Sequence, residues 1–358
     1  MKKIIILIEF FSEDYYESLD LIHLSKFFEI NIISYNTAVI KNNYNNIKII
    51  SLKSDDEVID LLENLNADYF FIGIYPLIHN KIFNYLKLKK FFTCSIHYLN
   101  PTPASKENLV KSILKFNIIK RWIDFVLKRE FSYNIVFTAG NIYKQKFKHI
   151  GQINIDTISR EYLFWFKKKI KPGNKNNIVF IDDGVGDHFD EYLLNFQRKN
   201  DEEYKYYIEL REFLNNIQNK TKKKIIVSLH PKRKELLEHP YKGFQTKIGK
   251  TLELICNSDF VIATNSLSIH YAILLDKPII LITSSNIPHE PIKKYVKSWS
   301  EEINCDLINI SDQSYILDLS FKNYNKNYKS LIKNYLNSNH ESKKKIISIW
   351  EDFINKYA

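Results

Sequence analysis

The sequence has little cysteine, glycine or proline. Its 358 residues include 3 cysteines, 8 glycines and 9 prolines. So few glycines and prolines exclude a fibrous or low-complexity chain. The cysteines Cys94, Cys256 and Cys305 have no metal-ligand spacing, and each lies in or beside an expected core element. They are therefore predicted to be reduced, buried thiols of a cytoplasmic protein.

Long hydrophobic runs are also missing. No stretch reaches the roughly 18 consecutive apolar residues that suggest a membrane-spanning helix. The opening MKKIIILIEFFSEDYY has only a short apolar run, which Glu9 interrupts, and SEDYYE stands where a signal peptide would have small residues. The start of the chain therefore predicts a buried first β-strand.

Acidic residues are outnumbered, with 41 Asp and Glu against 52 Lys and Arg and a net charge of +11. A positive surface attracts nucleic acid, anionic lipid or phosphorylated small molecules. No zinc-finger pattern or aromatic RNA-binding motif is present, so no nucleic-acid partner is expected. Basic amphipathic patterns near 111–130 and 327–357 instead predict peripheral contact with the inner face of the cytoplasmic membrane.

Apolar runs alternate with helical patterns along most of the chain, which predicts an α/β fold with parallel sheets covered on both faces. Hydrophobic residues make up 45% of the sequence, and the length suits two domains. The strands expected in the first half are 3–9, 30–35, 47–52, 69–74, 91–97 and 133–140. Those expected in the second half are 177–182, 224–230, 259–264, 278–284 and 306–311.

A charged stretch, KKKIKPGNKNN, interrupts this alternation and predicts a linker. We expect two Rossmann-like, doubly wound domains that face a cleft. Ligands of such sheets bind at the carboxyl ends of the strands. The expected divisions are an N-terminal domain over 1–166, the linker over 167–176, a C-terminal domain over 177–325 and C-terminal helices over 326–358.

Three successive strands of the second domain end in polar residues, and a parallel sheet would bring these ends to one crevice. The three strand ends read IDDG, LHPK and ATNSLS. Their polar residues and turn formers are Asp182, Asp183 and Gly184, then His230, Pro231 and Lys232, then Thr264, Asn265, Ser266 and Ser268.

Each strand end has a chemistry that suits a phosphate group. Asn265, Ser266 and Ser268 fall where a helix begins, and free N–H groups there bind anions, although such residues are also ordinary N-caps. The proline after His230 favours an extended backbone and a fixed imidazole, which could donate to a phosphate or protonate a leaving group. His230 could equally just close a strand.

The acidic pair could supply a general base. Adjacent residues of a strand point to opposite faces, so only one of Asp182 and Asp183 can enter the crevice easily. Asp-Asp-Gly is also an ordinary turn sequence. The GVG at 184–186 lacks the full glycine pattern of a dinucleotide-binding loop.

With these motifs, residues 177–285 resemble the bacterial sialyltransferases and polysialyltransferases with a GT-B fold. That group carries D/E-D/E-G, His-Pro and Ser-Ser/Thr motifs, which correspond here to Asp182-Asp183-Gly184, His230-Pro231 and Asn265-Ser266. The resemblance implies inverting transfer of a nonulosonic acid, or a related Kdo-type sugar, from a CMP-activated donor in bacterial surface glycan biosynthesis. The partners implied are the nucleotide-sugar donor and a glycan or lipid-linked acceptor.

The resemblance also implies roles for these residues. Asp183 would deprotonate the acceptor hydroxyl, His230 would stabilise or protonate the departing phosphate, and Ser266 would bind that phosphate. No metal or other cofactor is implied, because these groups and the helix end replace it. The C-terminal domain would hold the donor and the N-terminal domain the acceptor. Further donor contacts would come from Pro231, Lys232, Thr264, Asn265, Ser268 and Glu290.

The sequence departs from that group in two ways. The third motif begins with Asn265 rather than serine, and the acidic motif usually lies in the N-terminal domain. A base on the acceptor side therefore stays open, and its candidates are Glu9, Glu13, Asp14 and His97. Residues 249–283 also resemble many surface-polysaccharide glycosyltransferases, which share a helix, SD, a strand, a small polar turn and KPII.

Two other functions stay open. One is a different sugar-nucleotide enzyme of the same fold, such as a UDP- or GDP-sugar transferase, an epimerase or a polyol-phosphate transferase. The other is a non-enzymatic module that binds anionic glycans or lipids through its basic surface. The sequence does not distinguish the donor nucleotides, because each would need a phosphate-binding crevice.

Overall fold

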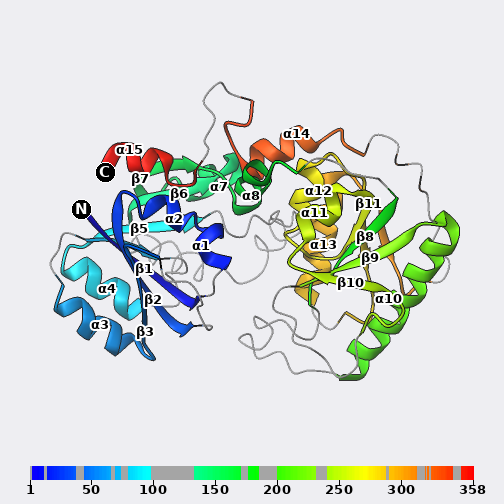
Figure 1. The fold of residues 1–358 in the computed structure, drawn as a ribbon, viewed down its shortest axis with the longest axis horizontal. Coiled ribbons are helices and arrows are strands. Elements are labelled where there is room, and N and C mark those ends of the chain that lie inside the picture. Colours follow the sequence, from blue (N-terminus) through cyan, green and yellow to red (C-terminus); the bar gives the residue numbers. More distant parts are fainter. Residues whose placement is uncertain are drawn as a thin grey trace, which may run out of the picture. The chain divides into compact units, whose positions relative to one another are not determined.

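The computed structural model divides into two compact units, each built on its own parallel sheet (Figure 1). The first unit contains the described residues up to Phe166 together with those from Ile332 to Ala358, and the second contains those from Lys167 to Leu331. The structure describes residues 2–11, 14–37, 44–65, 69–73, 80–97, 133–170, 176–184, 200–230, 240–287, 290–312, 319, 321, 324–341 and 348–358.

The sheet of the first unit has seven parallel strands in the order β3-β2-β1-β4-β5-β6-β7. Its strands are β1 (Lys2–Phe11), β2 (Phe28–Thr37), β3 (Ile47–Ser51), β4 (Tyr69–Gly73), β5 (Phe92–His97), β6 (Tyr133–Ala139) and β7 (Gly151–Thr157). Its helices are α1 (Asp14–Ser18), α2 (Leu21–Leu24), α3 (Asp55–Glu63), α4 (Asn80–Leu88), α7 (Gly140–Phe147), α8 (Arg160–Lys168), the π-helix η1 (Ile332–Leu336) and α15 (Glu351–Tyr357).

Local sequence explains α3 well. The Ser54 side chain accepts a hydrogen bond from the Glu57 N–H over 3.3 Å, and Glu57 in turn accepts from the Lys53 N–H over 2.9 Å. This reciprocal capping satisfies N–H groups at the start of the helix. Val58 and Leu62 then bury one side of α3 against the sheet.

Residues 17–29, ESLDLIHLSKFFE, have a helical apolar period, but they are helical only at the end of α1 and in α2. Asp20 has a left-handed backbone, with φ of 49°, and it separates α1 from α2. Phe28 already belongs to β2, and its side chain is fully buried. Burial in the sheet therefore overrides the local helical period here.

The segment from Ile332 onward packs into the first unit. Gly140, with φ of +72°, lies so close to this segment that an added Cβ would be 2.2 Å from the carbonyl oxygen of Asn334. The Thr157 hydroxyl donates to the carbonyl oxygen of Ile349 over 2.7 Å. Trp350 and Phe353 are fully buried. The end of the chain thus completes the core of the first unit.

The sheet of the second unit has six parallel strands in the order β10-β9-β8-β11-β12-β13. Its strands are β8 (Asn177–Ile181), β9 (Lys224–Leu229), β10 (Gln245–Ile248), β11 (Ser258–Ala263), β12 (Ile279–Thr283) and β13 (Leu307–Asn309). Its helices are α10 (Asn200–Thr221), α11 (Thr251–Cys256), α12 (Ile269–Leu274), α13 (Glu290–Ile303) and α14 (Tyr328–Leu331).

This strand order creates a switch point between β8 and β11. From β8 the chain proceeds outward to β9 and β10, then returns to the other side of β8 as β11. Ligands of doubly wound sheets bind outside the carboxyl ends of the strands at such a point. The second unit therefore has its expected ligand edge at the ends of β8, β9 and β11.

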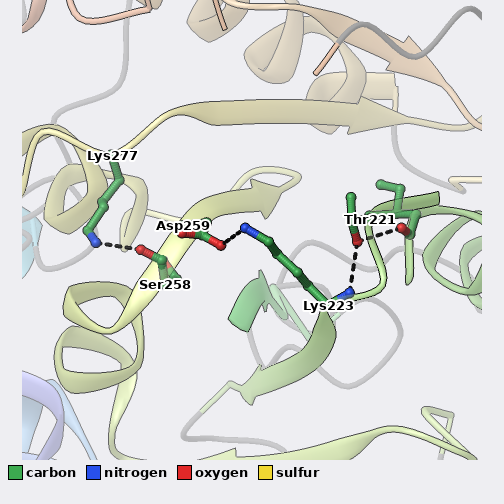
Figure 2. Close-up of polar contacts among 6 residues, drawn as sticks. Thr221, Lys223, Ser258, Asp259 and Lys277 are labelled. Atoms are coloured by element: carbon green, nitrogen blue, oxygen red, sulfur yellow. Dashed lines mark hydrogen bonds and ion pairs between the residues drawn. The ribbon is translucent and has the colours of Figure 1, made fainter. Parts of the chain in front are cut away.

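The opposite, amino-terminal edge of this sheet contains the SD and KPII residues (Figure 2). Lys223 pairs with Asp259, and the buried Lys277 amine donates to the main-chain carbonyl of Ser258. These contacts connect the starts of β9, β11 and β12. The SD and KPII residues thus fasten the amino edge of the sheet, away from its ligand edge.

None of the helices that the structure describes has the length and apolar character needed to cross a bilayer. Of the two basic patterns expected to contact a membrane surface, 111–130 lies outside the described residues. In 327–357, apolar side chains are buried within the fold: Tyr328, Leu331, Ile332, Tyr335, Leu336, Trp350 and Phe353.

Candidate active site

Three neighbouring strands bring the acidic, histidine and Thr-Asn-Ser groups to one edge of the second sheet. The main-chain N–H of His230, after β9, donates to Asp182 Oδ2 over 3.1 Å. The Thr264 hydroxyl, after β11, donates to Asp183 Oδ2. The prediction that these strand ends meet is therefore confirmed, and Asp182 and Asp183 form the junction between them.

Asp182 is a structural carboxylate. Its side chain is 1% exposed. Its Oδ1 accepts hydrogen bonds from the Gly184 N–H over 2.9 Å and from the Tyr241 hydroxyl over 2.7 Å, while Oδ2 accepts from His230. Hydrogen bonds to a charged acceptor are the stronger kind, and here they hold two loops against the end of β8. A buried carboxylate so engaged is poorly placed to take a proton from a substrate.

Asp183 points the other way, toward β11, and is half-buried. Burial raises the pKa of its carboxyl to about 6; the negative charge of Asp182 raises it further, whereas hydrogen bonds from Thr264 and from the Asn265 N–H lower it. A general base works best with a pKa near the operating pH. Of the two carboxylates, Asp183 is therefore the one suited to proton transfer.

His230 is held at its backbone, and its ring lies beside Gly184. The backbone N–H is bound by Asp182, and the imidazole lies against Gly184. A Cβ added at Gly184 would be 3.4 Å from His230 Cγ and 3.5 Å from Nδ1. Gly184 also has φ of +72°, which glycine adopts without strain. The glycine of the acidic motif is therefore needed for its backbone conformation, and it lies beside the histidine of the next motif.

The Thr-Asn-Ser turn leads into α12, a helix of six residues. Ser266 Oγ accepts from the Ser268 N–H over 3.3 Å, and Ser268 is the N-cap without a side-chain capping hydrogen bond. Asn265, Ser266 and Ser268 are half-buried, whereas Thr264 is fully buried. Thr264 and the Asn265 N–H thus connect the start of this turn to Asp183, and the Ser268 side chain makes no capping hydrogen bond.

Several expected site residues lie outside what the structure describes. Pro231, Lys232 and Glu13 are among the residues it does not describe. For four others only the backbone is described: Glu9 lies in β1, Asp14 begins α1, His97 ends β5 and Glu290 begins α13. The choice between Asp183 and a base from the first unit therefore stays open.

Sequence reasoning missed Tyr241, which follows Pro240 in a turn before β10. Its only sequence signal is an aromatic residue in an otherwise polar turn, HPYKG. It also missed Glu209 of α10, which accepts from Ser284 Oγ over 2.8 Å, from Asn286 Nδ2 over 2.7 Å and from Ser311 Oγ over 2.8 Å. This network fastens the turns after β12 and β13 to α10.

Among the described residues, no group of three or more His, Cys, Asp and Glu side chains could hold a metal ion. The site described above consists of one carboxylate suited to proton transfer, one half-buried imidazole and the Thr-Asn-Ser turn. Such groups can accept a proton, donate one and bind an anion.

No protein-family model and no curated protein matches the sequence. Among solved structures, Os79 from O. sativa in complex with UDP is 11% identical, with a TM-score of 0.56, covering 99% of this chain and 100% of that one. The wall teichoic acid polymerase TagF is 15% identical, with a TM-score of 0.52, covering 98% and 88%. A TagF variant soaked with CDPG is 16% identical, with a TM-score of 0.51, covering 99% and 88%. Two Rossmann-like, doubly wound units and these likenesses show that the chain has the GT-B fold.

Proposed function

We propose that this chain is an inverting glycosyltransferase that uses a CMP-activated nonulosonic acid or a related Kdo-type sugar. The observation that carries the proposal is the convergence of Asp183, His230 and the Ser266 turn at the switch point of the second sheet. The binding of UDP by Os79, which shares the fold, supports a nucleotide-linked donor for this chain. The CMP moiety and the sugar rest on the motif resemblance.

On the donor side, the Ser266 hydroxyl and neighbouring N–H groups bind the phosphate of the nucleotide. His230 follows the neighbouring strand β9, and its imidazole lies beside Gly184. As the bond between the anomeric carbon and the phosphate oxygen breaks, negative charge develops on that oxygen. His230 stabilises this charge or donates a proton to the oxygen. In other transferases a metal ion stabilises the charge of the leaving group. Metal-independent transfer is part of this proposal.

On the acceptor side, Asp183 takes the proton of the attacking hydroxyl. The acceptor oxygen bonds to the anomeric carbon on the face opposite the departing phosphate, so the configuration inverts. A pKa of about 6 leaves Asp183 mostly ionised at pH 7 and still basic enough to accept a proton. If the base comes from the first unit, as Glu9, Glu13, Asp14 or His97, Asp183 instead orients the Thr264–Ser266 turn.

A polyol-phosphate transferase is the second candidate. The likeness to TagF, which is a wall teichoic acid polymerase and was soaked with CDPG, favours this alternative over an epimerase. His230 and Ser266 would bind a phosphate in both reactions. The two candidates differ in the group that is transferred and in whether the nucleotide is a monophosphate or a diphosphate.

The acceptor is a glycan or a lipid-linked glycan, which loops of the first unit would select. Contact with the inner face of the cytoplasmic membrane stays a prediction for 111–130. In the described part of 327–357 most apolar residues are buried within the fold, which leaves the exposed cations of that part for an anionic surface.

Thermal stabilisation by CMP, CDP, UMP, UDP, GDP and ADP tests the proposal directly. A ligand that binds only the folded protein raises the melting temperature. A selective shift with CMP supports the proposed donor, and transfer from CMP-N-acetylneuraminate is then measured. A selective shift with CDP favours the polyol-phosphate alternative, and one with UDP or GDP contradicts the CMP donor. No shift with any nucleotide would contradict the donor site and favour a binding module.

A further inference from the structure

Tyr241 is fixed in the second unit by contacts that do not involve its hydroxyl. Its side chain is 1% exposed, and its ring centroid lies 5.8 Å from that of Phe180 and 5.7 Å from that of Tyr207. Arg211 of α10 donates to the carbonyl oxygen of Pro240 over 2.8 Å and holds the same turn. The ring is therefore positioned by packing, and the hydrogen bond of the hydroxyl is not needed to place it.

The Tyr241 hydroxyl donates to Asp182 Oδ1 over 2.7 Å, so it fixes one end of a buried carboxylate. The other oxygen, Oδ2, accepts from the main-chain N–H of His230 over 3.1 Å. A carboxylate is rigid and planar, so constraining one oxygen constrains the other. The hydroxyl and the backbone N–H of His230 are thus connected through a single carboxylate.

The ordinary sheet ladder does not reach His230. The pairing of β8 with β9 runs from Asn177↔Lys224 to Ile181↔Ser228, and one more bond joins the Asp182 N–H to the Ser228 carbonyl over 3.0 Å. His230 lies two residues beyond that last partner. Its hydrogen bond to the Asp182 side chain therefore holds the chain beside the end of β8, beyond the last main-chain bond between β8 and β9.

We propose that Tyr241 and Asp182 are positioning residues that hold His230 at the departing phosphate of the donor. The catalytic consequence rests on the proposed function, whereas the positioning itself does not. Neither residue touches substrate in this scheme: Tyr241 orients the Asp182 carboxylate, and Asp182 places the backbone from which the imidazole projects. Displacement of a reacting group by about 1 Å can cost on the order of a hundredfold in rate.

The test is Tyr241→Phe, which removes the hydroxyl and keeps the ring that packs on Phe180. Tyr328→Phe is a matched control, because the buried Tyr328 hydroxyl also donates over 2.7 Å, to the carbonyl oxygen of Lys277. Lys277 precedes β12 at the amino edge of the same sheet, so the control loses an equivalent bond away from the site. Melting temperatures are compared first to establish that both variants fold.

The first readout is the ¹H–¹⁵N resonance of the His230 amide in labelled protein. In Tyr241→Phe we expect this amide to shift and to exchange faster with solvent, with no change in Tyr328→Phe. An unchanged His230 amide in folded Tyr241→Phe would overturn the positioning role. If Tyr241→Phe does not fold, the same amide is measured in Asp182→Asn, which keeps the side-chain size, and the same two outcomes apply.

The second readout is the rate of transfer from CMP-N-acetylneuraminate as the probe donor. Tyr241→Phe should lower kcat about ten- to a hundredfold with KM within about twofold, whereas Tyr328→Phe keeps both. Equal losses in the two variants would reduce Tyr241 to a stabilising residue and overturn the proposal. If the unmodified protein transfers nothing, the proposed function fails, and the His230 amide still decides the positioning.

Discussion

The main-chain N–H of His230 and the carboxylate of Asp182 are joined by a 3.1 Å hydrogen bond, 48 residues apart in the sequence. This bond connects the acidic motif to the His-Pro motif. Asp183 extends the connection to β11 through Thr264. Of the two adjacent aspartates, Asp182 therefore holds the end of β9, and Asp183 faces the Thr-Asn-Ser turn.

His230→Ala should leave the fold intact and abolish most of the transfer. The backbone N–H that Asp182 binds is retained, and the half-buried imidazole lies at a strand end. General acid catalysis contributes about 10²- to 10⁴-fold, so kcat should fall by that order. The measurement is initial rate together with the melting temperature. Full activity in the variant, or loss of the fold, would contradict the assigned role.

Ser266→Ala should weaken donor binding by a smaller factor. One hydrogen bond to a charged group is worth about 1.5–3 kcal/mol, which corresponds to roughly ten- to a hundredfold in Kd. Titration calorimetry with the stabilising nucleotide measures this. Ser298→Ala is the control, because Ser298 Oγ donates to the carbonyl oxygen of Lys294 within α13. Equal nucleotide affinity in both variants would remove Ser266 from the phosphate site.

The pH dependence of kcat/KM should have an acid limb near pH 6. Asp183 must be ionised to act as the base, and burial raises its pKa to about 6. The hydrogen bond from Thr264 lowers that pKa, so Thr264→Val should move the limb to higher pH. Thr138→Val, at a buried threonine near the end of β6, should leave the limb in place. A limb that does not respond to Thr264→Val would favour a base from the first unit.

Asp183→Asn should stabilise the protein at neutral pH while lowering activity. The folded-state pKa of about 6 lies above the ordinary value of 3.8, so the folded state binds more protons between these values. The contribution of Asp183 to stability is therefore largest below about pH 4 and is lost as pH rises through about 6. Urea unfolding at pH 5 and pH 7.5 should show the larger gain at pH 7.5. A gain independent of pH would contradict the raised pKa.

Gly184→Ala should damage activity beyond its effect on stability. A left-handed backbone costs roughly 1–2 kcal/mol for a residue with a Cβ, and relieving that strain would move Gly184, which lies beside the His230 ring and donates its N–H to Asp182. Gly243→Ala is the matched control, because Gly243 has φ of +93° and no atom within 4 Å of an added Cβ. Both variants should lose similar stability by urea unfolding. Only Gly184→Ala should lose transfer activity. Equal activity in the two variants would show that the contact between Gly184 and His230 has no role in catalysis.

The expected strands that lie in apolar, β-branched runs are all present, because burial on both faces leaves a continuous hydrophobic signal. The missed strands β7 and β10 lie at sheet edges, where polar residues such as the exposed Gln152 and the half-buried Lys247 interrupt that signal. Edge pairing depends on a neighbouring strand that local sequence does not reveal.

The same limit applies to the site. His230 and the Thr264–Ser266 turn were predictable because each follows directly after a strong strand. Strand alternation also separated Asp182 from Asp183, but the anchoring role of Asp182 was not predictable, because it depends on Tyr241, which is 59 residues away in the sequence. A hydrogen-bonded partner in a distant turn leaves only a weak local pattern.

The return of residues 332–358 to the first unit has a consequence for synthesis on the ribosome. The residues of the second unit from Lys167 to Leu331 emerge as one continuous piece and can bury their own core as soon as they are made. The first unit begins earlier but lacks Trp350 and Phe353 until all of the second unit has been translated. The first unit is therefore started before the second unit and completed after it. While residues 332–358 are still missing, the apolar core of the first unit is unfilled and needs protection from aggregation.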